Sequence, residues 1–223
     1  MKKTNLSQND AASGLSACSG DPENPKRCAI LEAAGRLFLE RGFNATSMDA
    51  IAEAAPVSKP TLYSHFKDKS DLFSAVVSAR CCSMVHTLYE HTSSEEEDIE
   101  TALRAIAHSF FDLIYAPDSI SLYRIIISEL KQFPFLGETL YNQGAIKILS
   151  LLSGYLVQQN EKGVMQIEDP EMAARLFFSM LKGDHHMQCL LGIRAEISAE
   201  ERTHIIDSVV TLFTNGYCNC KKP

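Results

Sequence analysis

Apolar residues recur at three- and four-residue spacing along most of the chain, which is the period of one face of an α-helix. The first run follows Asn24 and Pro25, which favour a helix start, and stops at Gly42, which favours a left-handed C-cap. Its apolar positions share one face: Ile30, Ala33, Ala34, Leu37 and Phe38. We therefore expect a helix that begins at Pro25 and ends near Gly42.

Two short helices are expected next, separated by a break that contains Pro56. Ser58 is placed to cap the second of them, and Pro60 falls in its first turn, where no backbone N–H is needed. Leu62 and Phe66 are four residues apart and should face inward. This leaves the other residues of the segment facing outward: Lys59, Thr61, Tyr63 and His65.

Asp68 begins a fourth helix, which we expect to run to about His91. Later apolar runs predict helices at about 96–115, 119–132, 135–161, 170–191 and 198–217. Strand-like runs are few and short, so the expected fold class is all-α. We expect three parts: a polar, flexible N-terminal arm over 1–22, a domain of short helices over 23–70, and a larger helical domain over 71–223.

Charge is divided unevenly between the two halves of the chain. The net charge is −7, but residues 1–80 are close to neutral and nearly all the acidity lies in residues 81–223. Because exposed charges more than about 10 Å apart are largely screened at ~0.1 M salt, a local basic site near Lys59 can still bind phosphates. No apolar run is long enough for a membrane span, and no secretory signal is seen, so we expect a cytoplasmic protein without a membrane partner.

A helix followed by two short helices with a tight break is typical of a helix-turn-helix, whose second helix enters the major groove of DNA. The stretch RCAILEAAGRLFLERGFNATSMDAIAEAAPVSKPTLYSHFKDKSDLFSAVV, covering about residues 26–77, resembles the DNA-binding domain of the TetR family. The later segment FFSMLKGDHHMQCLLGI is similar to a C-terminal type found among multidrug-efflux regulators. The resemblance implies a homodimer that binds a palindromic operator in double-stranded DNA, usually as a repressor, and is released by a small-molecule effector.

The resemblance also implies that residues 23–70 are the helix-turn-helix DNA-binding domain, that residues 71–223 are the ligand-binding and dimerisation domain, and that a defined set of residues contacts DNA. The implied DNA contacts are Thr46, Ser47, Lys59, Pro60, Thr61, Tyr63, His65 and Lys69. Among them, Lys59, Pro60 and Thr61 are the candidates for base recognition, and Tyr63 and Lys69 for phosphate binding. A regulator of this kind needs a mostly apolar pocket with a few polar groups. Our candidates for those groups are His108, Tyr123, His185, His186 and Gln188.

An alternative is a thiol-redox or metal-responsive regulator of the same fold. Seven cysteines are present, His185 and His186 lie close before Cys189 in a helical segment, and Cys218 and Cys220 form a pair at the tail. No clean four-ligand spacing appears, so we expect no metal site and no cofactor. Motifs typical of nucleotide-binding, hydrolase and zinc-protease enzymes are missing, so no catalytic residue is expected.

Pro56 departs from the pattern of the family, which usually has glycine at this turn. The turn often needs a positive φ, whereas the proline ring holds φ near −65°. We expect Pro56 to end the preceding helix early and to force a rebuilt turn. Two interpretations remain open: this branch uses a different turn and remains a repressor, or the chain is a variant with damaged DNA binding.

Overall fold

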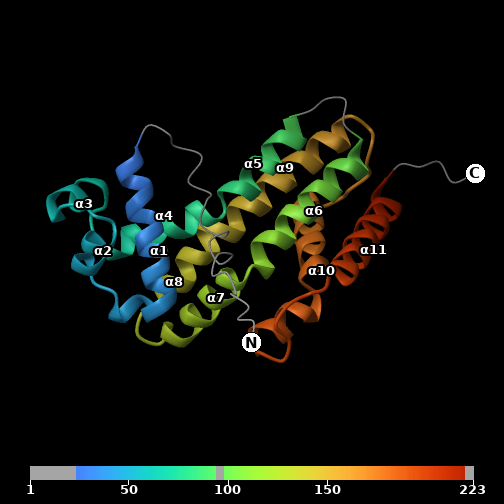
Figure 1. Cartoon of the computed structure of the whole chain (residues 1–223). Coiled ribbons are helices and arrows are strands. Elements are labelled where there is room, and N and C mark those ends of the chain that lie inside the picture. Colours follow the sequence, from blue (N-terminus) through green and yellow to red (C-terminus); the bar gives the residue numbers. More distant parts are fainter. Residues whose placement is uncertain (1–23, 94–97, 219–223) are drawn as a thin grey trace, which may run out of the picture.

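The protein is described by a computed structural model, which covers residues 24–93 and 98–218 (Figure 1). The expected arm over 1–22 lies outside these residues. One end of the molecule is formed by α1 (Pro25–Ala45), α2 (Met48–Ala54), α3 (Lys59–His65) and α4 (Lys69–Arg80). The remainder consists of α5 (Cys82–Ser93), α6 (Ile99–Tyr115), α7 (Pro117–Glu129), α8 (Phe135–Thr139), the π-helix η2 (Leu140–Ile146), α9 (Lys147–Glu161), α10 (Pro170–Leu190) and α11 (Ala199–Tyr217).

The all-α class is confirmed, because the only β-type pairing among the described residues is an isolated bridge between Met165 and Cys218. The predicted caps of the N-terminal helices are also present. The Asn24 side chain accepts a hydrogen bond from the backbone N–H of Arg27, and the carboxylate of Asp68 caps α4 in the same way. These caps use only near neighbours in sequence, which is why the sequence could predict them.

Gly42 has a φ of +80° and a ψ of 172°, so the backbone leaves helical geometry at the predicted residue, but Gly42 is not the expected left-handed C-cap, because the C-cap of α1 is Thr46. The backbone then forms one further helical turn, and α1 extends to Ala45. A second prediction is wrong: the helix expected to run from Asp68 to His91 is interrupted at Cys81, where α4 ends and α5 begins. A third prediction is also wrong, because the single helix expected over 135–161 is divided into α8, η2 and α9.

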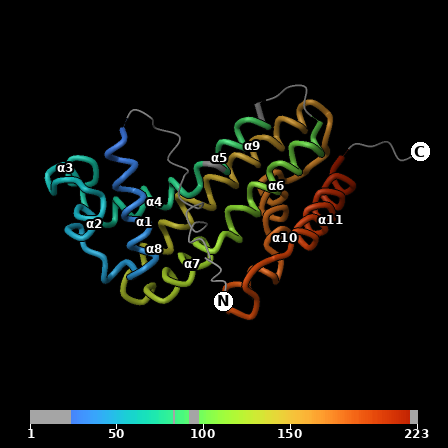
Figure 2. The backbone as a smooth tube through the Cα atoms, in the orientation of Figure 1, coloured from blue at the N-terminus to red at the C-terminus, as the bar shows by residue number. Residues whose placement is uncertain are grey.

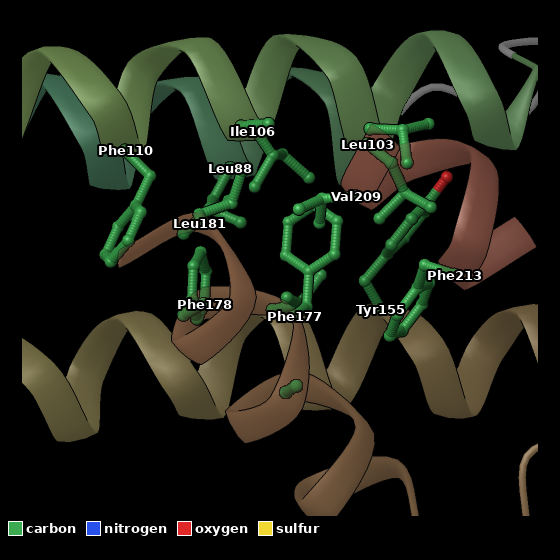
Figure 3. Close-up of a cluster of buried hydrophobic side chains, with 14 of the residues drawn as sticks. Leu88, Leu103, Ile106, Phe110, Tyr155, Phe177, Phe178, Leu181, Val209 and Phe213 are labelled. Carbon is green, nitrogen blue, oxygen red and sulfur yellow. The ribbon is translucent and has the colours of Figure 1, made fainter. Parts of the chain in front are cut away.

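Two apolar cores hold these elements together. The first lies under the N-terminal helices and joins α1 to α4 through residues such as Phe38 and Phe73, with α7 adding Leu122 and Ile126. The second fills the body between α5, α6, α9, α10 and α11. Figure 3 shows Phe177 and Phe178 of α10 within this second core, among side chains of the neighbouring helices. The tube view places α2 and α3 at one end and α11 at the other (Figure 2).

The N-terminal core includes residues of α4 beyond residue 70, together with parts of α7 and α8. The two cores therefore meet along α4, whose first half packs against α1 and whose last turn reaches the body of the molecule. No described helix is long and apolar enough to cross a membrane.

Candidate DNA-binding surface and ligand pocket

The helix pair α2–α3 lies at one end of the molecule (Figure 1) and carries several exposed polar residues. The Ser58 side chain accepts a hydrogen bond from the Thr61 N–H at 3.2 Å and so caps α3 as predicted. Leu62 is fully buried beneath the helix, whereas Tyr63 is 51% exposed. Burying Leu62 fixes the rotation of α3, so its opposite face is turned to solvent.

The predicted contacts on and beside this face differ in exposure. Ser47, Lys59, Pro60 and Tyr63 are exposed, whereas Thr61 and His65 are half-buried. The Lys59 ammonium lies 2.7 Å from the carboxylate of Asp49 on α2, and both side chains are more than half exposed. An exposed pair of this kind is weak, so Lys59 can exchange Asp49 for a phosphate or a base edge at little cost.

Thr46 is a correction to the predicted set of DNA contacts. Its side chain is almost fully buried, and its hydroxyl donates to the backbone carbonyls of Leu37 and Gly42. The hydroxyl therefore satisfies carbonyls at the C-terminal end of α1 and has no path to DNA. Ser47, the next residue, is the true cap of α2, since its hydroxyl oxygen accepts from the Ala50 N–H at 3.1 Å.

Lys69 makes structural contacts that the sequence analysis did not predict. Its ammonium donates to the carbonyls of Phe43 and Thr46 at 2.7 Å each and to that of Asn44 at 3.3 Å. It also lies 4.4 Å from the centroid of the Phe43 ring. A lysine has three N–H donors, and the fold uses all of them here. Lys69 therefore stabilises the α1–α2 turn in this conformation, and its contact with phosphate stays a prediction.

The turn between α2 and α3 keeps the form of a Schellman C-cap. The N–H of Val57 donates to the carbonyl of Ala52 at 3.0 Å, which is the outer bond of that motif. Pro56 occupies the position that needs a left-handed residue and has a φ of +27°. It has no N–H to make the inner bond of the motif. The predicted rebuilt turn is therefore wrong: the ordinary turn is kept, and the proline is held far outside its preferred φ.

A cavity of about 350 Å³ lies between α4, α6, α7, η2, α9 and α10. Its wall is mainly apolar, with Leu122 from α7, Ile148 from α9 and Phe178 from α10. The π-helix η2 adds Tyr141 and Gly144, and π-helical turns often occur at functional sites. The size and lining match those of small-molecule sites in other proteins.

Only one of the five predicted ligand residues lines this cavity. Tyr123 contributes to the wall, and burial raises the pKa of its hydroxyl. His186 packs behind it, with ring centroids 5.3 Å apart, and burial lowers its pKa to about 4. The others lie elsewhere: His108 beside Arg202 and Gln188 against Asp184.

His185 also lies outside the cavity wall, 3.8 Å from the carboxylate of Asp184. The sequence analysis missed the polar groups that do line the cavity. They include Arg80, Cys81, Ser119, Arg175, Ser179 and Lys182. A signal was present for Lys182, because it is a charged residue that directly follows the apolar run FFSML of α10.

The alternative of a metal- or thiol-responsive regulator is not favoured by the described residues. They contain no cluster of three or more His, Cys, Asp or Glu that could hold a metal ion. Burial raises the pKa of Cys189, and raises that of Cys81 to about 11. Thiols of this kind react slowly, because the thiolate is the reactive form. The predicted pair at the tail lies partly outside the described residues, since Cys220 is not among them.

Comparisons with known proteins agree with this architecture. Residues 30–76 match the family described as bacterial regulatory proteins, tetR family, and residues 101–219 match the C-terminal domain of AefR-like transcriptional repressors. The HTH-type transcriptional activator FasR of Mycolicibacterium smegmatis is 37% identical over 93 residues, which cover 42% of each chain. The chain therefore spans less than half the length of this curated relative.

Two solved structures match over most of the chain. A TetR-family regulator from Mesorhizobium loti has a TM-score of 0.75 and 28% identity, covering 86% of this chain and 96% of its own. The flavonoid-responsive regulator FrrA has a TM-score of 0.69 and 30% identity, covering 87% of this chain and 98% of its own. The chain belongs to the TetR family of bacterial transcriptional regulators, which are DNA-binding proteins and not enzymes.

Proposed function

We propose that the protein is a homodimeric repressor that binds a palindromic operator and is released when a small apolar or amphipathic molecule occupies the cavity. The observation that carries this proposal is the position of α4. Leu72 and Phe73 at its start pack in the N-terminal core, whereas Arg80 and its neighbour Cys81 line the cavity. A ligand that moves the end of α4 would therefore also move the DNA-binding helices.

The α4–α7 contact gives this coupling a physical link. The guanidinium of Arg80 lies 3.4 Å from the carboxylate of Asp118 at the start of α7. At the other end of α7, the Glu129 carboxylate accepts a hydrogen bond from the Asn44 N–H at 3.0 Å. The cavity and the α1–α2 turn are thus joined by α4 and by α7. Because α4 and α7 both connect the two regions, a movement at the cavity would be passed to the N-terminal helices.

The outer faces of α10 and α11 support a homodimer. Both helices and the turn after α10 expose large apolar residues that face away from the core: Met172, Leu176, Met187, Leu191 and Leu212. Exposed apolar side chains gathered on two long helices favour a protein interface. A two-fold dimer through these helices would form a four-helix bundle and pair two copies of α3 for a symmetric DNA site.

Among the predicted DNA contacts, Ser47, Lys59, Pro60, Thr61, Tyr63 and His65 remain in the proposed surface. Control of an efflux system also remains a prediction. The names of relatives support a transcriptional regulator but do not show whether it activates or represses transcription. FasR is called an activator, whereas the matched C-terminal family is named for repressors. The flavonoid response named for FrrA supports a small-molecule effector here as well.

The test begins with DNA selected by the protein from a random pool, followed by binding measured by fluorescence anisotropy. We expect a two-fold symmetric site whose affinity falls steeply with salt, because phosphate contacts release counterions. Tyr63→Phe should weaken binding to every sequence alike, and Tyr89→Phe, an exposed tyrosine on α5, serves as the control. Selection of no sequence, or equal binding by the Tyr63 variant, would count against the proposed surface.

A further inference from the structure

The cavity wall carries three cationic side chains and no carboxylate among the described residues. Arg80 comes from the end of α4, and Arg175 and Lys182 come from α10. The rest of the lining is apolar or uncharged, including Phe110, Leu122 and Phe178. A cavity that bound cationic or neutral molecules would have no need of several positive charges, so the charge of the wall bears on the class of ligand.

Arg175 already has partners at the surface. Its guanidinium donates to the Glu171 carboxylate at 2.7 Å and to the Tyr141 hydroxyl at 3.4 Å. This ion pair is exposed and spans one turn of α10. Arg175 therefore has its charge balanced without a ligand, and it serves as a reference for the other two cations.

Arg80 is only partly balanced. Its side chain is 10% exposed and its one ion pair within the described structure, with Asp118, is long at 3.4 Å. Its Nε is buried and donates no hydrogen bond to the described residues. An unmade hydrogen bond of a buried charged group is destabilising. The guanidinium therefore has unused donor capacity, and Arg80 is one of the residues that line the cavity.

Lys182 is not balanced by any carboxylate of the described residues. None of their acidic groups lies within ion-pair distance, and its aromatic partner is Tyr123, with the ammonium 5.8 Å from the ring centroid. Burial lowers the pKa of Lys182, and no opposite charge from the described chain acts against this effect. A partly buried, unpaired ammonium is costly, and a bound anion is the partner that it lacks.

We propose that the cavity binds an amphipathic organic anion, with its acidic head group held by Arg80 and Lys182 and its apolar body against Phe110, Ile148 and Phe178. This inference rests on the proposed function only in taking the cavity as the effector site. The two cations supply charge-assisted hydrogen bonds to a carboxylate or a phenolate. The apolar wall excludes water and strengthens that attraction. Small inorganic anions would gain the charge contacts but not the apolar contacts.

The test is calorimetric titration of the DNA-free protein with three molecules of equal chain length: decanoate, decan-1-ol and decyltrimethylammonium. We expect decanoate to bind at least tenfold more tightly than decan-1-ol, and the cation to bind more weakly than both. A parallel titration with 2-naphthoate and 2-naphthol methyl ether distinguishes a flexible alkyl anion from a planar aromatic one. Equal binding of decanoate and decan-1-ol, together with equal binding of the two naphthyl compounds, would overturn the proposal.

Lys182→Met is the matched variant, because it keeps nearly the length of the side chain and removes its unpaired charge. We expect it to melt no lower than the original protein without ligand, and to lose the preference for the anion over its neutral counterpart. Lys162→Met, at the exposed end of α9, should retain that preference. An unchanged preference in the Lys182 variant would refute the assignment of the head group.

Binding and release from DNA are measured separately, so that the two proposals can fail separately. If an anion binds with the expected preference but leaves the protein–DNA complex intact, the ligand inference stands and the proposed release mechanism fails. If a neutral compound releases DNA while neither anion binds, the proposed function stands and this inference fails.

Discussion

At the scale of single residues, Pro56 combines two costs in one turn. Its φ of +27° lies far from the value that its ring prefers, and its missing N–H leaves one bond of the C-cap unmade. Strained backbone of this kind costs on the order of 1–3 kcal/mol. The structure thus favours the interpretation that Pro56 destabilises the DNA-binding unit. The turn keeps its positive φ at residue 56 and does not adopt a geometry that suits proline.

We predict that Pro56→Gly raises both thermal stability and DNA affinity. Glycine adopts positive φ freely and restores the N–H, so we expect a gain of about 1–2 kcal/mol. For a chain of this size, that corresponds to a rise in Tm of about 2–8 °C. Thermal melting monitored by circular dichroism and anisotropy with the selected DNA site measure the two effects.

Pro60 provides the control for this substitution. It occupies the first turn of α3, a position that suits proline. Pro60→Gly should therefore lower stability slightly, by loss of a restraint on the unfolded chain. If Pro56→Gly melts no higher and binds DNA no better than the original protein, the turn tolerates its proline and the strain argument is wrong.

A second residue-scale prediction concerns acid stability. His186 is buried with its Nε2 unpartnered among the described residues, and burial, aided by the charge of Lys182, lowers its pKa to about 4. The unfolded chain has an ordinary histidine pKa near 6.5, so between about pH 6.5 and 4 the unfolded state binds more protons. The stability contributed by neutral His186 is therefore present above pH 6.5 and is lost as the pH falls toward 4.

We expect His186→Phe to reduce the fall in Tm between pH 7 and pH 4.5, since phenylalanine cannot take up a proton. The aromatic contacts with Tyr115 and Tyr123 would be kept. If Tm falls equally with pH in the original protein and in the His186 variant, the loss of stability in acid does not come from His186.

Residue identity alone could not separate contact residues from structural ones on the DNA-binding unit. Thr46 and Ser47 are adjacent hydroxyls with the same local pattern, yet one is buried under α1 and the other caps α2. Lys69 looks like a surface cation in sequence, but the carbonyls that hold it come from residues 43–46, more than 20 positions earlier. Only the folded chain brings these groups together.

At the scale of elements, α10 changes direction at Gly183, which has φ +52° and ψ −161°. This region of backbone conformation is essentially restricted to glycine. The kink lies beside the carbonyl of Lys182, which accepts a hydrogen bond from the Tyr115 hydroxyl of α6 at 2.5 Å. The kink and this bond therefore position the half of α10 that carries the cavity residue Lys182.

We predict that Gly183→Ala destabilises the fold by about 1–3 kcal/mol, because a side chain is strained in this conformation. Gly154→Ala is the control: it lies in the helical interior of α9 with open space around it, and alanine there should stabilise by about 0.5–1 kcal/mol. Urea unfolding followed by circular dichroism measures both changes. Equal effects of the two substitutions would show that the kink at position 183 does not require glycine.

Elements with local signals could be predicted, whereas those set by packing could not. Asp169 followed by Pro170 marks the start of α10, and the Asp169 side chain accepts from the Met172 N–H as the pattern indicates. By contrast, the break at Cys81 and the wide turns of η2 have no sequence signal. They occur where Gly144 of η2 lies against the sulfur of Cys81, so tertiary packing decides the geometry.

At the scale of the whole molecule, the proposed dimer predicts a defined response to charge on α11. Leu212 is 65% exposed on the outer face of this helix. We expect Leu212→Glu to give a monomer in light scattering at micromolar concentration, because two like charges would face each other across the two-fold axis. Val157→Glu, on the exposed side of α9, should leave the dimer intact. If the Leu212→Glu variant remains a dimer, Leu212 does not lie in the dimer interface.

The path from the cavity to the DNA-binding surface leads to the last prediction. A ligand can release DNA only if it binds the DNA-free state more tightly, and the coupling must then be equal in both directions. We expect the factor by which decanoate lowers DNA affinity to equal the factor by which the selected DNA site lowers decanoate affinity. Pro56→Gly should strengthen DNA binding while leaving decanoate affinity without DNA unchanged, because residue 56 does not line the cavity. Titrations of each ligand with and without the other measure all four affinities. A factor of one would show that decanoate and DNA bind independently, and a changed decanoate affinity of the DNA-free Pro56→Gly protein would show that residue 56 also acts on the cavity.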